Sequence, residues 1–563
     1  MSLLQKPRYQ FVFFLILFLI INLLQSHFTA LFEDEAYYWV WSKDLAFGYF
    51  DHPPLVALWI KISSFFFDGE LGVRFFSTIS FTIMLIFIWL LIDIKEKWNY
   101  VWLFFLLIIS VVFLNIYGFI TTPDTPLLLF VAVFLYFYKQ FLKNNSWTNT
   151  LLLGFSMAAL LYSKYHGILI ILFTLLSNLD LLKNKKFWAA SVFGFLLFIP
   201  HLHWQYVNDF PSFRYHLIER GAKKYKIGHT LIHFVNQIAI VGITFPVIYM
   251  AFFKQKISSK FERALKFITL GFIIFFFFSS FKSNPQAQWT AAILIPLIIL
   301  SFPYLVHHQK ARKWLIILGT IQFGILLIIR VFLANSSISP IVLEPHIAKT
   351  WITKLKQKTN NKPIVFLNSY RNASMYSFYT GIKTHSYSLL GGRKSQYDLN
   401  DFEDKMQHDH VYVVSKFLNR DPFLIKKKKD SLKGYAIKDY TTFQKVKCTI
   451  EKNTLNMKEG EKYNFTFRFT NTYNKNINFD HVRFFGVFQG YKNIILAQVP
   501  IKISKLEPLE TNERKLFKAT ITVPQIVYDD NITFRVALEF YDMLEGYQGN
   551  KVQIELNKNP SPQ

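Results

Sequence analysis

The chain has 563 residues, of which 52% are hydrophobic and 62 are phenylalanine, and its formal net charge is +27. Together with a positive mean hydropathy, this composition argues against an ordinary soluble globular protein. The single cysteine, Cys448, excludes an internal disulfide and a zinc site built on several thiolates, and it leaves the redox compartment open.

The positive charge is concentrated in short loops between apolar stretches, which argues against a nucleic-acid partner. Basic residues in such loops mark the cytoplasmic side of a multi-span membrane protein. The loops contain Lys95 and Lys97, Lys139 and Lys143, Lys183 to Lys186, Lys254 to Lys266, and Lys310 to Lys313. We therefore predict an integral membrane protein that is surrounded by membrane lipids.

The N-terminus carries Lys6 and Arg8, followed by an apolar run from Tyr9 to about Leu31. This run is longer than the core of a signal peptide and has no small-residue cleavage site, which predicts a retained first span with a cytoplasmic N-terminus. Hydropathy predicts about eleven spans in total. They lie near residues 10–31, 72–93, 100–120, 126–142, 149–163, 166–182, 187–206, 230–253, 265–281, 287–306 and 313–333.

The stretch 149–182 is too long for one ordinary helix, and basic loops stand at both of its ends. Two short spans joined by an external turn at Lys164 would place both loops inside the cell. The alternative is one tilted helix with a buried lysine, which costs several kcal/mol unless the charge is paired.

With this topology, the polar segments of chemical interest all fall on the outer face. They are the first loop at about 32–71, Thr121 to Pro126, Ser163 to Gly167, the 207–229 loop, and Lys282 to Trp289. Random placement would have divided them between the two faces. The sequence therefore predicts an outward-facing site.

After Leu333 the long apolar stretches end, and the chain is expected to form soluble external domains. Short strands and helices predict a small α/β module, and alternating apolar and polar residues then predict a β-sandwich. The module has predicted strands at 363–367 and 411–415 and helices near 347–358 and 399–407, and the sandwich has strands at 463–470, 517–523 and 532–540. We expect a membrane domain at 1–335, the α/β module at 336–445 and the β-sandwich at 446–563.

Acidic residues in the outer segments are the candidates for chemistry. Asp34 and Glu35 follow the first span, and Asp51 and His52 precede two prolines. Charged groups held close to hydrocarbon are costly, so clustered acids there usually mark a site. Each proline biases the residue before it toward an extended backbone, which holds His52 extended. The structural alternative is that the prolines only end a helix and His52 only caps it.

Asp124 stands between two prolines at the outer end of a predicted span. It is either a site residue or the N-cap of the following helix, and the sequence favours neither.

Several runs of residues resemble the GT-C superfamily of polyprenyl-phosphate-sugar glycosyltransferases, in the branch of protein O-mannosyltransferase-like and lipid A aminoarabinose transferase-like enzymes. They are Asp34 to Trp39, Gly48 to Leu55, Gly72-Val73-Arg74, Thr122 to Leu128 and Ser163-Lys164-Tyr165. The resemblance covers roughly residues 1–335 and extends weakly into the α/β module. It has no counterpart for the predicted sandwich.

The resemblance implies an inverting transfer in which Asp34 and Glu35 are the catalytic acids and Asp34 is the base. It implies that Glu35 and Asp124 shape the substrate pocket and that Asp51-His52 lies at the carrier phosphate. Relatives have a glutamate and a lysine at these two positions, so His52 makes the cationic charge conditional near neutral pH. The cations that could compensate are Arg74, Lys164 with its neighbour Tyr165, Arg214 and Arg220.

Transfer from such a donor needs one carboxylate base and cations for the departing phosphate, because the phosphate leaves as a stable anion without a general acid. A hydrolase would instead need two carboxylates that flank one bond. The need for a metal stays open, and Asp51 is the acid that could bind a divalent cation.

We therefore predict sugar transfer from a polyprenyl-phosphate donor to a protein, lipid or glycan acceptor, at the outer face of a bacterial inner membrane, with the C-terminal domains in the periplasm. The alternative is a transporter or flippase of a lipid-linked sugar, although the sequence lacks the internal repeats that many transporters have. A third alternative is a surface anchor for a sandwich that binds glycans or partners, which would need far fewer spans. The donor sugar and the acceptor are not visible in the sequence.

Overall fold

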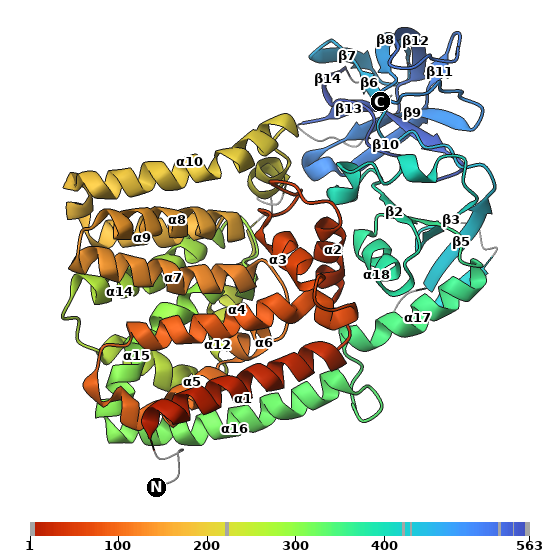
Figure 1. The fold of residues 1–563 in the computed structure, drawn as a ribbon. Coiled ribbons are helices and arrows are strands. Elements are labelled where there is room, and N and C mark those ends of the chain that lie inside the picture. The colour runs from red at the N-terminus through yellow and green to blue at the C-terminus, as the bar shows by residue number, and fades with distance from the viewer. Residues whose placement is uncertain are drawn as a thin grey trace. The chain divides into compact units, whose positions relative to one another are not determined.

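The computed structural model describes residues 6–219, 225–418, 423–427, 431–526, 531–543 and 545–557. The chain forms two compact units, Met1–Ala348 and Lys349–Gln563. Figure 1 shows that the first unit is helical and that the second holds the strands. The order of the elements agrees with the predicted membrane helices followed by C-terminal β-sheets.

The first unit is built of helices. They are α1 (Pro7–Phe28), α2 (Glu33–Ser42), α3 (Leu55–Ser63), α4 (Gly69–Leu91), α5 (Val101–Ser110), α6 (Val112–Tyr117), α7 (Asp124–Lys143), α8 (Trp147–Ser163), α9 (Gly167–Ser177), α10 (Lys185–Val207), α11 (Pro211–Phe213), α12 (Ile227–Val241), α13 (Phe245–Lys254), α14 (Lys260–Ser279), α15 (Leu294–His307) and α16 (Gln309–Ala334). All but α2, α3 and α11 overlap the spans expected from hydropathy.

Six helices of the described chain are long and apolar enough to cross a membrane, and the bent pair α12–α13 would be a seventh. The six are α1, α4, α7, α10, Ala287–His307 and α16. Helices that face lipid leave apolar side chains uncovered by protein, and only 22% of the apolar window of α1 and 28% of that of α16 is buried. The predicted count of about eleven spans stays a prediction.

Some of the predicted spans are interrupted. The span expected at 100–120 is divided at Val111, where extended backbone separates α5 from α6. The stretch 149–182 forms α8 and α9, with Lys164 at their junction. The span expected at 230–253 is bent by 96° between α12 and α13. The bend follows Gly242, whose φ of +87° is readily adopted only by glycine.

A buried arginine connects the last membrane helix to the first. Arg330 of α16 is 6% exposed. Its Nη2 group donates to Asn22 Oδ1 of α1, and its Nε group donates to Asn115 Oδ1 of α6, both at 2.8 Å. The guanidinium is therefore held by neutral amide oxygens.

The second unit begins with a five-stranded sheet in the order β2-β1-β3-β5-β4. β1 pairs in parallel with β2 and β3, and β5 is antiparallel to β3 and β4. The strands are β1 (Ile364–Leu367), β2 (Thr384–Tyr387), β3 (Val411–Ser415), β4 (Phe423–Lys426) and β5 (Ser431–Ile437), accompanied by α17 (Glu344–Lys358) and α18 (Tyr370–Thr380). The expected strands at 363–367 and 411–415 are thus present.

The helix predicted near 399–407 is wrong. Only short 3-10 turns form there, η6 (Gln396–Asp398) and η7 (Asp404–Met406). The Asp398 carboxylate accepts hydrogen bonds from the Ser395 N–H at 2.7 Å and the Ser388 hydroxyl at 2.8 Å. With Ser395 this carboxylate forms a capping box, but the turn that it begins ends after Asp398.

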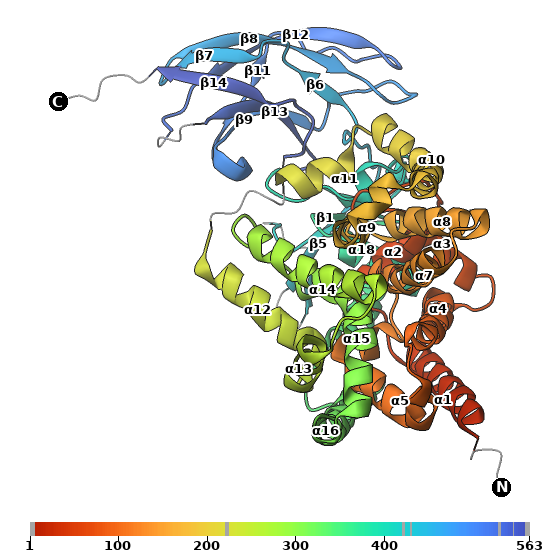
Figure 2. The same ribbon diagram turned by 90° about the vertical axis from the view of Figure 1, so that its left-hand side faces the viewer.

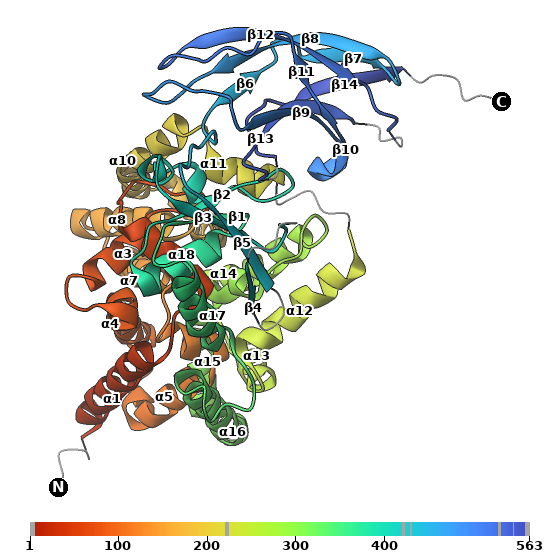
Figure 3. The ribbon, with the colours of Figure 1, turned by 90° about the vertical axis from the view of Figure 1, so that its right-hand side faces the viewer.

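Two further sheets have the orders β10-β9-β13-β14-β7 and β11-β12-β8-β6. Figures 2 and 3 show β9 and β13 in one layer and β8 and β12 in another. Their strands are β6 (Lys447–Thr449), β7 (Thr454–Lys458), β8 (Lys462–Thr470), β9 (Val482–Gln489), β10 (Ile495–Pro500), β11 (Lys502–Ile503), β12 (Arg514–Thr522), β13 (Thr533–Phe540) and β14 (Val552–Asn557). One hydrophobic cluster includes Phe467 of β8, Phe517 of β12 and Phe534 of β13. The predicted division of this unit into two domains stays a prediction.

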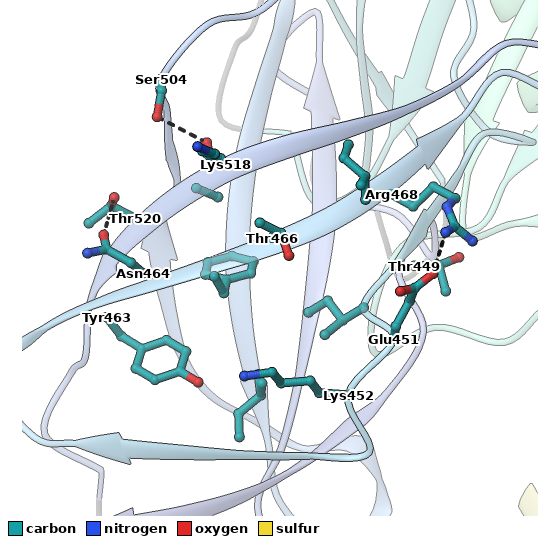
Figure 4. Close-up of a pocket in the computed structure, with 15 residues that line it drawn as sticks. Thr449, Glu451, Lys452, Tyr463, Asn464, Thr466, Arg468, Ser504, Lys518 and Thr520 are labelled. Carbon is teal, nitrogen blue, oxygen red and sulfur yellow. Dashed lines mark hydrogen bonds and ion pairs between the residues drawn. The ribbon is translucent and has the colours of Figure 1, made fainter.

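A cavity of about 580 Å³ lies beside β8 in the second unit. Figure 4 shows that its one carboxylate, Glu451, is paired with Arg468, and that Thr520 donates to Asn464. A single acid that is already paired offers no base, so this cavity is not the candidate catalytic site.

Candidate active site

The first turn of α2 carries the acids Glu33, Asp34 and Glu35. Carboxylates are favourable there because the N–H groups at a helix N-terminus are not yet paired. The Glu35 carboxylate accepts a hydrogen bond from the Phe32 N–H at 3.1 Å, which fixes the start of the helix. Glu35 is fully buried, whereas Asp34 is half-buried. The two adjacent acids therefore lie in different environments.

Glu35 forms a buried ion pair with Arg74 of α4. Arg74 Nε donates to Glu35 Oε1 at 2.8 Å, Arg74 Nη2 donates to Oε2, and neither side chain is more than 1% exposed. The Thr121 N–H adds a hydrogen bond to Oε1 at 2.8 Å. Arg74 Nη1 donates to the Ser26 and Thr29 carbonyls at the end of α1, and Nη2 also donates to the Ala30 carbonyl. The pair thus joins α1, α2, α4 and the segment before α7.

Asp124 begins α7 and pairs with Lys164 at the α8–α9 junction. Lys164 Nζ lies 2.7 Å from Asp124 Oδ1 and 2.9 Å from Oδ2, and each side chain is 6% exposed. The N-cap position of α7 is Pro123, with no capping side chain. Of the two interpretations of Asp124, the N-cap is therefore not realised, and the pairing compensates the buried lysine.

Asp51 and His52 lie in a loop that packs on α2. The Tyr49 ring stacks on Trp41 with their centroids 4.6 Å apart, and the Tyr49 hydroxyl donates to the Trp41 carbonyl at 3.0 Å. Burial raises the pKa of Tyr49, so this donor stays protonated. The His52 ring centroid is 6.3 Å from that of Tyr38, which also belongs to α2.

Side chains from the later part of the first unit anchor the same loop through its carbonyl groups. His201 bonds to Phe47 at 2.6 Å, Ser212 to Tyr49 at 2.9 Å, and His216 to Asp51 at 2.8 Å. These anchors are not among the predicted site residues, because each lies more than 150 positions along the chain from its partner. No local sequence pattern marks such a pair.

Tyr165 connects the α8–α9 junction to this loop. Its hydroxyl lies 3.1 Å from His201 Nε2 and accepts a hydrogen bond from Gln205 at 3.0 Å. Its ring centroid lies 6.0 Å from that of His216. Tyr165 therefore has a positioning role in the structure.

The structure joins by contacts the segments that carry seven of the predicted residues, Asp34, Glu35, Asp51, His52, Asp124, Lys164 and Tyr165. Contacts pass from α2 to the segment before α7, from Asp124 to the α8–α9 junction, through His201 of α10 to the loop after α2, and back to α2. We call Asp34, Asp51, His52, Asp124 and Lys164, which these segments carry, the loop cluster.

The remaining predicted cations are placed differently. Arg214 pairs with Asp209, and their side chains are 56% and 70% exposed. Arg220 lies outside the described residues, and Arg74 is engaged with Glu35. Lys164 and His52 are thus the predicted cations that lie within the loop cluster.

The described residues contain no group of three or more His, Cys, Asp or Glu side chains placed to hold a metal ion. Protein-bound magnesium and calcium ions are held by several oxygen ligands, of which Asp51 would supply at most two. A magnesium ion can complete its shell with waters and substrate phosphates, so a metal at Asp51 stays a prediction, and we derive no step through one.

Comparisons with known proteins find a matching family model and similar solved structures. The family model described as dolichyl-phosphate-mannose-protein mannosyltransferase matches residues 51–204. The crystal structure of ArnT from Cupriavidus metallidurans in the apo state has a TM-score of 0.54 at 12% identity, and the match covers 76% of this chain and 97% of that one. The structure of the same protein bound to undecaprenyl phosphate has a TM-score of 0.51, with the same identity and coverage. Among curated proteins, none matches this sequence.

These findings confirm the resemblance to the GT-C superfamily. At this low identity the two ArnT structures show a shared fold, and the mannosyltransferase family model supports a glycosyltransferase. The apolar helices and the shared fold support an integral membrane protein.

Proposed function

We propose that the chain is an inverting glycosyltransferase that moves a sugar from a polyprenyl-phosphate-linked donor to a protein, lipid or glycan acceptor on the outer face of the membrane. The loop cluster supports this proposal, because its segments, which are far apart in the sequence and joined by contacts, carry a half-buried acid, two cations and two further acids. The family model and the fold shared with ArnT, one structure of which contains undecaprenyl phosphate, add support. We further propose a bacterial inner membrane, with the N-terminus in the cytoplasm.

In the proposed reaction, the Asp34 carboxylate accepts the proton of the acceptor hydroxyl while the acceptor oxygen bonds to the anomeric carbon. The bond from that carbon to the phosphate oxygen breaks on the opposite side, so the configuration inverts. The carrier leaves as a phosphate monoester with a second pKa of about 6, and no general acid is required.

Glu35 is proposed as a positioning residue, although the sequence suggested a catalytic acid. Both of its oxygens accept hydrogen bonds from Arg74 and from backbone N–H groups. These bonds fix the helix turn that carries Asp34. They also engage both Glu35 oxygens, so Glu35 is poorly placed to act as the base.

Lys164 and His52 are proposed to face the carrier phosphate. A lysine ammonium has three donors, and the two bonds from Lys164 to Asp124 leave one of them for a phosphate oxygen. The His52 ring centroid lies 5.9 Å from that of His216, whose bond to the Asp51 carbonyl holds the loop in place.

The test compares three kinds of cells: cells that do not make the protein, cells that make it, and cells that make the Asp34→Asn variant. Mass spectrometry of carrier lipids and surface glycans should show an accumulated polyprenyl-phosphate sugar and one missing modification in the first and third cases. General base catalysis contributes roughly 10²–10⁴-fold, so purified Asp34→Asn protein should bind donor and transfer sugar slower by about that factor. A flippase would move the intact donor across the membrane without breaking its sugar–phosphate bond, and that result would refute the proposal.

A further inference from the structure

A buried arginine lies among apolar side chains in the second unit, on one face of the sheet that contains β9 and β13. Arg535 of β13 is 7% exposed and stands directly opposite Val487 of β9. Val487 packs with Ala537 and Leu390 in a hydrophobic cluster that also contacts Tyr547. A guanidinium in such surroundings gives up hydration and needs a compensating charge or hydrogen bonds.

The same face of the sheet shows how an arginine is usually compensated. Four residues further along β13, Glu539 stands opposite Arg483, and the two form an ion pair. Arg535 forms no ion pair within the described part of the chain, and its buried Nε atom has no hydrogen-bond partner there. The guanidinium makes a cation–π contact with the Tyr547 ring, whose centroid lies 5.4 Å from the guanidinium carbon.

A buried acceptor lies beside this donor. Gln489 stands opposite Thr533, which places it diagonally next to Arg535 on the same face. Gln489 is 1% exposed, and its Nε2 group donates to the Asn493 carbonyl at 3.2 Å. Its Oε1 atom has no partner among the described residues.

A second cation shares the aromatic ring. Lys394 Nζ lies 5.3 Å from the centroid of Tyr547, and the Tyr547 hydroxyl donates to the Gly392 carbonyl at 2.7 Å. The strand face therefore combines an uncompensated guanidinium, an open amide oxygen and a further positive charge.

We propose that Arg535 is the centre of an oxyanion-binding site that takes a phosphate or carboxylate group carrying a hydroxyl. A guanidinium can bind such a group through two parallel N–H bonds. The hydroxyl would donate to Gln489 Oε1, and Lys394 would attract the anion. This site uses no residue of the loop cluster. A negative result for anion binding would therefore leave the proposed glycosyl transfer untouched, and the reverse also holds.

The experiment uses the full-length protein in detergent at constant ionic strength and follows thermal unfolding of the second unit. Cys448 is the only cysteine of the chain and is buried in this unit, so its reaction with a thiol reagent on heating reports when the unit opens. Inorganic phosphate should raise this transition temperature progressively, because a ligand that binds only the folded state stabilises it. Glucuronate and dodecyl phosphate are titrated in parallel, as a carboxylate with hydroxyls and as a phosphate on an alkyl chain.

In the absence of anion, the Arg535→Met protein should be at least as stable as the unmodified protein, since the change removes a buried uncompensated charge. When anion is added, its transition temperature should not rise. Arg483→Met is the matched control, because it should lower stability by leaving Glu539 without its partner while the anion-dependent rise persists. The proposal is overturned if none of the three probes stabilises the unit, or if Arg535→Met responds to them as the original protein does. The probe that stabilises at the lowest concentration identifies the class of anion.

Discussion

Removing Arg74 should strongly destabilise the membrane unit. Its guanidinium makes five hydrogen bonds, two to Glu35 and three to carbonyls at the end of α1. Arg74→Met leaves the buried Glu35 carboxylate with two backbone N–H donors, those of Phe32 and Thr121. Breaking a buried pair by removing one partner typically costs about 3–5 kcal/mol. Three backbone carbonyls also lose their donors, and a buried acceptor without a donor costs further free energy. We therefore expect a cost at the upper end of that range.

The assay is unfolding of the full-length protein in mixed micelles with increasing SDS, followed by tryptophan fluorescence. Arg74→Met and Glu35→Leu should each destabilise, and the double variant should cost clearly less than the sum, since it leaves no buried charge without a partner. Arg214→Met is the control, because its exposed pair with Asp209 should contribute only about 0–1 kcal/mol.

Additive costs in the double variant, or an Arg74→Met protein as stable as the original, would refute the positioning role of the pair. If Glu35→Gln kept normal stability but lost transfer as fully as Asp34→Asn, the base would be Glu35.

Donor binding should weaken as pH rises through the titration range of histidine, near 6.5 for a free side chain, if His52 contacts the carrier phosphate. His52→Lys should flatten this dependence, and a folded His52→Ala protein with unchanged donor affinity and pH profile would assign His52 a structural role. For the topology, a cysteine at the exposed Asn284 should react with an impermeant thiol reagent from outside, whereas one at the exposed Lys183 should not; labelling of both would overturn the predicted orientation. In the second unit, burial raises the pKa of Glu403 to about 7, above the value of about 4.3 in an unfolded chain. Its contribution to stability is therefore complete below about pH 4 and is lost as pH rises to about 7, by roughly 4 kcal/mol in total. Glu403→Gln should remove this fall, measured from the onset of Cys448 reactivity at pH 5 and pH 8, and an unchanged pH dependence would contradict the assignment.

The membrane helices and the acidic motifs could be predicted because their signals are local. A long apolar run predicts a span, and acids beside it are energetically costly near lipid, so they predict a functional site. Neither signal requires knowledge of tertiary contacts. The break at Val111 could not be predicted in this way, since the run on both sides of it is equally apolar. The helix expected near 399–407 failed although a local helix signal is present, because the capping box of Ser395 and Asp398 begins only a single 3-10 turn.

The roles of the cations depend on packing between distant segments. Arg74 and Glu35 are 39 positions apart, and Lys164 and Asp124 are 40 apart. The sequence identified all four residues as site candidates, but it could not show that they pair with one another. We propose His52 and the third donor of Lys164 as the groups that interact with the carrier phosphate.

The amide oxygens that hold Arg330 impose an order on the biogenesis of the membrane unit. α16 is synthesised long after α1 and α6, because Arg330 is 308 positions from Asn22 and 215 from Asn115. Arg330 lies four residues from the C-terminal end of α16, where an arginine costs less than the about 2.5–3.5 kcal/mol of a helix centre. The hydrogen bonds that hold it exist only when Asn22 and Asn115 are adjacent. We therefore expect α1 and α6 to be packed together when the last helix docks, and a change that displaces α1 to leave Arg330 without Asn22 as its partner.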